Sequence, residues 1–145
     1  MSNAGNEIGV PAEHVTTIDY EMKLPNGPAN PDRVFDGQRF VHHKAEGAEW
    51  RAHRLTGFVA RDTTIGENTG GVAGVHVVRK GKGAAAWTTH AGDILFTFVM
   101  EGRMRLEGEG QEAHVLEAGD AFVIPPGLAT RYAEASEDLE LLEVA

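Results

Sequence analysis

The stretch GDAFVIPPGLATRYAE, residues 119–134, decides the fold of this chain. It opens with a Gly-Asp pair that is typical of a turn and continues as an apolar strand through Phe122 and Ile124. Pro125-Pro126-Gly127 then reverses the chain, because proline fixes the backbone at one turn position and glycine accepts unusual angles at the next. The stretch therefore predicts two strands joined by a tight turn.

Short apolar runs separated by glycine also fill the rest of the chain after Asp36. They are RFVHH (39–43), GFVAR (57–61), GVHVV (74–78), ILFTFVM (94–100), RMRL (103–106), AHVL (113–116), AFVI (121–124) and LELLEVA (139–145). Such runs predict strands, and no segment sustains a helical period, so we expect few and short helices. The segment RMRLEGEGQEAHVL (103–116) predicts a hairpin that turns at Gly108 to Gly110. The alternation in LELLEVA predicts an edge strand with a solvated acidic face.

The predicted fold class is all-β, a single small antiparallel β-barrel or jelly roll, because closure hides strand edges in a chain of hairpins. A length of 145 residues fits one domain. Residues 1–36 carry four of the six prolines and are predicted to form an irregular N-terminal arm or loop, with the barrel domain at 37–145. Ser2-Asn3-Ala4 has the composition of a cloning-vector remnant, and a natural N-terminus fits these residues equally well.

Composition restricts the function classes. The formal net charge of −9 predicts repulsion of nucleic acid and of anionic membrane surfaces. No stretch approaches the roughly 20 apolar residues that span a bilayer, so we expect a cytoplasmic protein. The absence of cysteine excludes disulfides, thiolate metal sites and a cysteine nucleophile, and leaves His, Asp and Glu as metal ligands. Serine hydrolase chemistry is excluded because Ser2 and Ser136 are the only serines and neither lies in a nucleophile elbow.

Residues 81–134 resemble the two sequence motifs of the cupin superfamily. The second motif places its glycines at Gly119 and Gly127 and its proline at Pro125, and the first motif closes at Gly102. The wider stretch 59–144 is similar to single-domain cupins of the conserved-barrel type that share the segment Thr69-Gly70-Gly71. The resemblance implies a small β-barrel in which three histidines and a glutamate hold iron, manganese, zinc, nickel or copper.

The ligand positions of those motifs are largely changed in this chain. Counting back from Gly102 puts the family's second histidine at His90, its first histidine at Thr88 and its glutamate at Leu95. The third histidine falls at Thr130. The resemblance therefore implies a degenerate metal site with one remaining imidazole.

The predicted ligand-binding residues share a barrel wall in this alignment. They are His90, Thr88, Leu95, Thr130 and Tyr132. Hydroxyl groups are weak metal ligands and good hydrogen-bond partners, so these replacements favour a small polar organic ligand. His90 is also a candidate metal ligand, and His76 is a second one if its side chain points inward. A single histidine that only hydrogen-bonds a neighbour is the simplest alternative for His90.

The other histidines are predicted to be structural or solvated. His42 and His43 lie side by side on a probable strand, where a surface or interface position is favoured. His14, His53 and His114 are predicted to be exposed.

Three functions remain open from the sequence. The first is a small-molecule-binding barrel with a metal-poor pocket. The second is a metal-dependent cupin enzyme of dioxygenase or isomerase type, in which His90 and other histidines hold a divalent ion such as Fe, Mn, Zn or Ni. The third is a dimerisation or interaction domain, and in each case we expect a homodimer. The sequence does not decide whether the protein is an enzyme.

Overall fold

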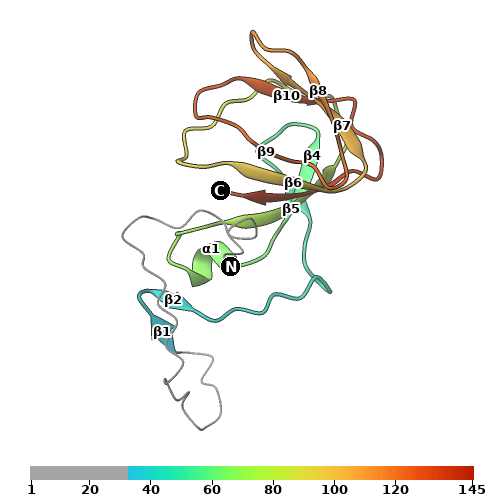
Figure 1. Ribbon diagram of the computed structural model, residues 1–145. Coiled ribbons are helices and arrows are strands. Elements are labelled where there is room, and N and C mark those ends of the chain that lie inside the picture. The colour runs from blue at the N-terminus through green and yellow to red at the C-terminus, as the bar shows by residue number, and fades with distance from the viewer. Residues whose placement is uncertain (1–32) are drawn as a thin grey trace, which may run out of the picture.

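Two antiparallel sheets that face each other make up the fold of residues 33–145, which are the residues described by the computed structural model (Figure 1). The smaller sheet has the order β10 (Thr130–Ala133), β7 (Arg103–Gly108), β8 (His114–Glu117). The larger sheet has the order β3 (Arg51–Ala52), β4 (Phe58–Asp62), β5 (Val75–Lys80), β11 (Glu140–Val144), β6 (Phe96–Glu101), β9 (Ala121–Val123). Hydrogen bonds do not close the two sheets into a continuous barrel. The predicted all-β, antiparallel jelly-roll class is confirmed.

Helical structure is minimal, as the sequence predicts. Within residues 33–145 the only α-helix is α1 (Ile65–Asn68), which precedes the Gly70-Gly71 turn into β5. No helix in this part of the chain is long and apolar enough to cross a membrane. The predicted hairpin at 103–116 is present, because β7 and β8 pair from Arg103 opposite Glu117 to Leu106 opposite His114.

A small separate hairpin precedes the two sheets. Its strands are β1 (Val34–Phe35) and β2 (Gln38–Arg39), and Asp36 and Gly37 at its turn both have positive φ. The prediction of a strand over RFVHH is wrong beyond Arg39, because β2 pairs only with the two residues of β1. His42 is exposed and His43 half-buried in the following irregular segment. Most of the predicted N-terminal arm, with His14 and residues 2–4, lies outside the described residues.

The prediction that the C-terminal run is a solvated edge strand is also wrong. Strand β11 lies in the middle of the larger sheet, between β5 and β6. The alternation of LELLEVA predicts a solvated acidic face, but Glu143 lies on the inner face of the sheet with Leu141 and is only 4% exposed. The face is covered by the second sheet and by the segment after β3, and the charge of Glu143 is compensated there.

The strand register sorts the inner face of the larger sheet into two rows, because directly opposed residues of paired strands share a face. The apolar row is Ala60, Val78, Leu141 and Val99. The next row is mostly polar and contains Asp62, His76, Glu143, Thr97 and Phe122. The apolar row forms the core with residues such as Leu95, Met104 and Tyr132, and the polar row supplies the candidate site.

Candidate functional site

A buried carboxylate is the centre of the polar row. Glu143 on β11 accepts a hydrogen bond from His53 Nε2 on Oε1 and one from Arg54 Nη2 on Oε2, both at 3.0 Å. The side chains of Glu143 and His53 are 5% and 6% exposed, whereas that of Arg54 is 38% exposed. Because His53 and Arg54 follow directly after β3, that segment brings both donors across the inner face of the sheet.

The ring of His53 is fixed in one tautomer by its second nitrogen. Nδ1 accepts a hydrogen bond from the backbone N–H of Leu55 at 3.2 Å, and an amide N–H can only donate. The ring proton therefore resides on Nε2, which donates it to Glu143. With both nitrogens engaged, His53 orients the carboxylate and has no free nitrogen to offer a ligand.

The surroundings of Glu143 keep its carboxyl group ionised. Burial is the largest influence and raises its pKa, but the hydrogen bond from His53, followed by the charge and hydrogen bond of Arg54, outweighs burial and lowers the pKa overall. The site therefore contains a carboxylate at neutral pH, neutralised by the guanidinium of Arg54.

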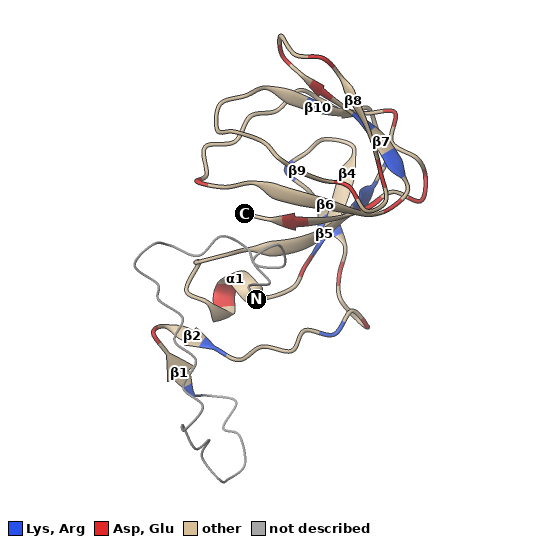
Figure 2. Ribbon diagram, in the orientation of Figure 1, with Lys and Arg blue, Asp and Glu red and all other residues tan. Residues whose placement is uncertain are grey.

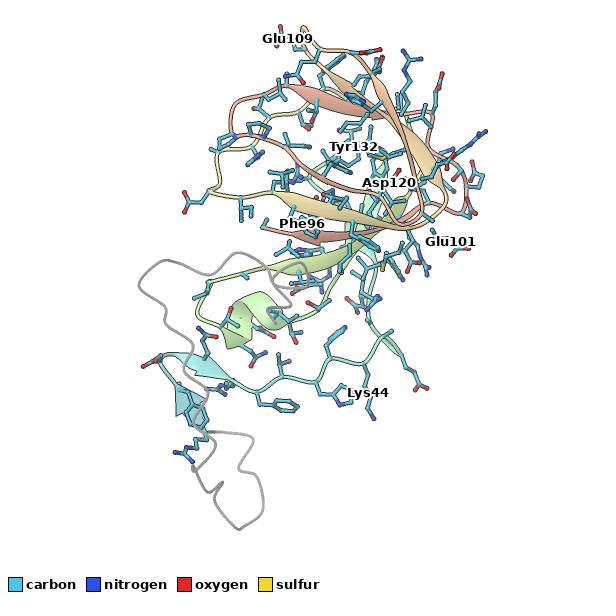
Figure 3. The ribbon with its side chains drawn as sticks, in the orientation of Figure 1. Lys44, Phe96, Glu101, Glu109, Asp120 and Tyr132 are labelled. Atoms are coloured by element: carbon cyan, nitrogen blue, oxygen red, sulfur yellow. The ribbon has the colours of Figure 1, made fainter. Side chains whose placement is uncertain are left out.

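Two buried hydroxyl groups lie next to this carboxylate and make no well-aligned hydrogen bond. Tyr132 on β10 is 3% exposed and Thr97 on β6 is 0% exposed, and neither Tyr132 Oη nor Thr97 Oγ1 has a partner in hydrogen-bonding geometry. Tyr132 lies between the two sheets (Figure 3), where its ring packs edge-on against Phe58 and Phe122. Burial, followed by the charge of Glu143, raises the pKa of Tyr132 to about 12, although hydrogen bonding with the nearby Thr97 and Arg54 opposes this rise. The two hydroxyls therefore lie close to each other and to Arg54, in the packed interior rather than on the wall of a cavity.

A cavity opens beside the carboxylate. It has a volume of about 390 Å³ and lies over the ends of β3, β4, β5 and β11. Its lining residues are Arg51, Ala52, His53, Arg54, Ala60, Asp62, His76, Glu143 and Ala145. The volume lies in the range of small-molecule sites, roughly 300 to 1,000 Å³.

The residues predicted from the motif alignment lie mainly around a second region. Thr88 and Thr130 face each other across a two-hydrogen-bond bridge with N–H to O distances of 2.9 Å. Leu95 is 3% exposed and belongs to the hydrophobic core. Thr130 contributes, with Phe122 and Ile124, to a cavity of about 310 Å³ lined mostly by apolar side chains. The structure thus places Tyr132 next to Glu143 and Thr130 beside a separate cavity.

His90 is occupied by a structural contact. Its Nε2 lies 2.5 Å from the backbone oxygen of Ile124, and its own backbone oxygen accepts a hydrogen bond from Gly127. The ring of His90 therefore contacts the backbone between β9 and the Pro-Pro-Gly turn. His76 is half-buried on the polar row, with Nε2 3.7 Å from Asp62 Oδ1.

The donor set does not fit a cupin metal centre. The family positions carry Thr88, Leu95 and Thr130, and the remaining His90 contacts a backbone carbonyl. In residues 33–145 no three or more His, Asp or Glu side chains are arranged to hold a metal ion. At Glu143, Arg54 already occupies one carboxylate oxygen.

Sequence reasoning missed the cluster itself. The prediction that His53 is exposed is wrong, since its side chain is 6% exposed and bonded to a residue 90 positions away. His114, by contrast, is exposed as predicted. The one signal for this site in the sequence is an acidic residue, Glu143, within the apolar C-terminal run. That Glu143 is buried follows from the central position of β11 in the sheet, which the sequence does not show.

Comparisons with known proteins agree with this architecture. Residues 74–145 match the Cupin domain family. The chain is similar in structure to KdgF from Halomonas sp., with 18% identity and a TM-score of 0.56 over 72% of this chain and 92% of KdgF. It is similar to Pac13, a nucleoside dehydratase of Streptomyces, with 19% identity and a TM-score of 0.54 over 73% of this chain and 82% of Pac13.

Hydroxypropylphosphonic acid epoxidase from S. wedmorenis has 13% identity and a TM-score of 0.56, over 72% of this chain and 58% of that chain. Identities this low show a shared fold alone. No curated protein is detectably similar to the chain in sequence. Residues 74–145, which carry the Gly-Asp and Pro-Pro-Gly turns and most of both sheets, belong to the Cupin domain family.

Proposed function

We propose that this cupin binds a small polar organic molecule through hydrogen bonds in the cavity beside Glu143. The observation that carries the proposal is the cavity of about 390 Å³ whose wall contains the buried carboxylate of Glu143 together with Asp62 and His76. A cavity of this size with a few polar groups on its wall is typical of a small-molecule site.

The protonation states favour binding over proton transfer. Tyr132, with a pKa of about 12, stays a neutral phenol that donates or accepts a hydrogen bond at neutral pH. Glu143 has a lowered pKa and two hydrogen-bonded oxygens, which makes it a weak general base. His53 has both ring nitrogens engaged. A group tuned for acid-base catalysis would instead have a pKa near the working pH.

A metal-dependent enzyme is a second candidate, favoured by one observation. The cavity beside Glu143 is lined by two imidazoles and two carboxylates, those of His53, His76, Asp62 and Glu143. One of the structurally similar proteins, HppE, has been determined in an Fe(II) form. Coordination in this chain would require Glu143 to exchange Arg54 for a metal ion and His76 to leave Asp62.

A thermal-shift screen of small polar metabolites tests where the ligand binds. Compounds that stabilise the wild-type protein are expected to lose their effect in Glu143→Gln and His76→Gln, which change polar side chains on the wall of the cavity. Glu112→Gln is the matched control, because its carboxylate lines the other cavity. Loss of the effect in Glu112→Gln alone would move the site to that cavity and contradict the proposal.

Metal analysis separates the two candidate functions. Protein purified without chelators is expected to contain only traces of transition metal by inductively coupled plasma mass spectrometry. About one equivalent of iron, zinc or manganese per chain, lost on His53→Gln or His76→Gln, would support the metal enzyme instead.

A further inference from the structure

We propose that the outer face of the larger sheet, at its β9 edge, is a docking surface for an extended segment of another protein in which apolar and basic residues alternate. This surface lies on the opposite face of the sheet from Glu143 and its cavity, so the proposal is independent of the function proposed above. It follows from an exposed apolar patch, from acidic residues that border the patch, and from a free strand edge.

The outer face of the larger sheet is apolar around β6. Thr97 and Val99 of β6 are fully buried and point inward, so the residues that alternate with them point outward. The register adds outward side chains from the neighbouring strands β9 and β11. We call this set the outer patch, and its members are Ile94, Phe96, Phe98, Met100, Ala121, Val123 and Leu142.

The outer patch is open to solvent, most of all at the edge of the sheet. All of its side chains are at least partly exposed, and Val123 and Ile94 are 57% and 42% exposed. An antiparallel sheet with one solvated face normally has polar side chains on that face. Contiguous exposed apolar side chains with a polar border are typical of an interaction surface, so the outer patch is a candidate docking site.

Three exposed acidic residues border the outer patch. Asp93 directly precedes its first residue, Glu101 follows its segment on β6, and Asp120 precedes its segment on β9. The backbone oxygen of Asp120 accepts the N–H of Val99 at 2.8 Å, which places Asp120 beside β6. Acidic residues lie at both ends of β6 (Figure 2), with Glu101 and Asp120 towards the same end (Figure 3). Within residues 33–145 none of the three forms an ion pair, so the border is negative.

The negative border decides which partner fits. A second copy of the chain, with net charge −9, would bring the same carboxylates to the interface, and like charges across an interface oppose association. The homodimer expected from the sequence would therefore use another surface. Residues 1–32 contain five acidic residues and one lysine, so they carry the same sign of charge as the border. Basic side chains that alternate with apolar ones complement both the border and the patch.

The edge of β9 favours a partner in extended form. Among the described strands, β9 is at the end of the larger sheet and pairs only with β6. Ile124 donates its N–H to the backbone oxygen of Leu95 at 3.2 Å, and bonded and non-bonded pairs alternate along antiparallel strands. Ala121 and Val123 are therefore at non-bonded positions, and their N–H and C=O groups point away from β6. An added strand can bond to these groups and place alternate side chains on the outer patch.

Three fluorescently labelled synthetic peptides test the proposal by fluorescence anisotropy with the full-length protein. Each has the length of a strand, and they alternate valine with lysine, valine with glutamate, and serine with lysine. The valine-lysine peptide is expected to bind at least about tenfold more tightly than either of the others, because it alone complements both the patch and the border. Its binding should weaken as the salt concentration rises.

A substitution at the edge strand tests the position of the site. Val123→Lys places a positive charge on the outer patch and should weaken binding of the valine-lysine peptide at least about tenfold. The matched control is Val115→Lys, because Val115 is 64% exposed on β8 of the smaller sheet and the charge change is the same. This control should bind the peptide as the wild-type protein does.

A double substitution tests the acidic border. Asp93→Asn combined with Glu101→Gln removes two negative charges from the border and should weaken binding and reduce its salt dependence. The control Glu109→Gln combined with Glu112→Gln removes the same charge from exposed positions at the turn between β7 and β8. Asp120 stays unchanged in both, because its Oδ2 accepts the backbone N–H of Glu117.

The outcomes that would overturn the proposal are distinct from those that concern the Glu143 cavity. Equal affinity for the three peptides, no saturable binding of the valine-lysine peptide, or equal losses in Val123→Lys and Val115→Lys would each contradict it, provided that circular dichroism shows folded variants. Light scattering on the same two variants tests the second copy as occupant. A dimer that dissociates in Val123→Lys and persists in Val115→Lys would assign the outer patch to self-association and overturn the proposal.

Discussion

Replacing His53 by phenylalanine should remove a hydrogen bond to the buried carboxylate of Glu143 while keeping an aromatic ring at position 53. In the native structure His53 Nε2 donates to Glu143 Oε1 at 3.0 Å, and both side chains are about 95% buried. In the variant, that oxygen loses its donor in a region where water has little access. Glu143 would then depend on Arg54 alone.

The expected loss in the free energy of unfolding is about 2 to 3 kcal/mol. A hydrogen bond to a charged group contributes roughly 1.5 to 3 kcal/mol, and breaking a fully buried ion pair costs about 3 to 5 kcal/mol. The lower range applies here because Arg54 remains in place, so the carboxylate keeps one hydrogen-bonded partner of opposite charge. His53→Gln should recover much of the loss, since an amide N–H can take the place of Nε2–H.

Urea unfolding followed by tryptophan fluorescence measures these differences. The control His114→Phe, at an exposed position on β8, should change stability by less than about 0.5 kcal/mol. The double variant His53→Phe with Glu143→Leu should be more stable than His53→Phe alone, because no buried charge is left without a partner. A loss in His53→Phe no larger than in His114→Phe would refute the role given to the pair.

The pH dependence of stability should reflect Glu143: because its folded pKa is lowered, its stabilisation is present above the unfolded value of about 4.3 and is lost as the pH falls through the folded value. Glu143→Gln should flatten the acid limb of an unfolding curve measured against pH, and an unchanged limb would count against an ionised buried carboxylate. Tyr132→Phe should leave stability unchanged or raise it by up to about 1 kcal/mol in urea titrations, since it removes a hydroxyl without a partner. Gly102→Ala should lower the free energy of unfolding by more than about 2 kcal/mol, because φ is +80° there and the added Cβ would lie 2.7 Å from Leu139 Cα. In the control Gly110→Ala the added Cβ meets no atom within 4 Å, so the loss should be about 1 kcal/mol. Light scattering at micromolar concentration should report a homodimer, and a monomer alone would remove that expectation.

The fold could be predicted because it depends on local signals. The Gly-Asp and Pro-Pro-Gly turns at 119–127 and the glycine turn at 108–110 each act within a few residues, and the strands between them alternate with a period of two. Gly102 closes the first motif for a reason that the structure makes plain, since a side chain there would collide with Ser136 and Leu139. Such constraints are visible in a single sequence.

The candidate site could not be predicted in full because it is built from distant segments. The motif alignment predicts Tyr132, but its neighbours Glu143 and Arg54 come from β11 and from the segment after β3. Alternation shows that Glu143 differs from its neighbours on the strand and does not show whether the strand is central or at an edge. The side-by-side order of β5, β11 and β6 decides that, and it is a property of the tertiary topology.

The most direct test of the central claim is a high-resolution crystal structure of the protein with a compound that stabilises it in the thermal-shift screen. The account predicts the compound in the cavity beside Glu143, within hydrogen-bonding distance of polar side chains on its wall, with His53 and Arg54 still bonded to Glu143. A metal ion coordinated by His90 or by His53 and His76, or the compound bound in the cavity beside Thr130, would contradict it.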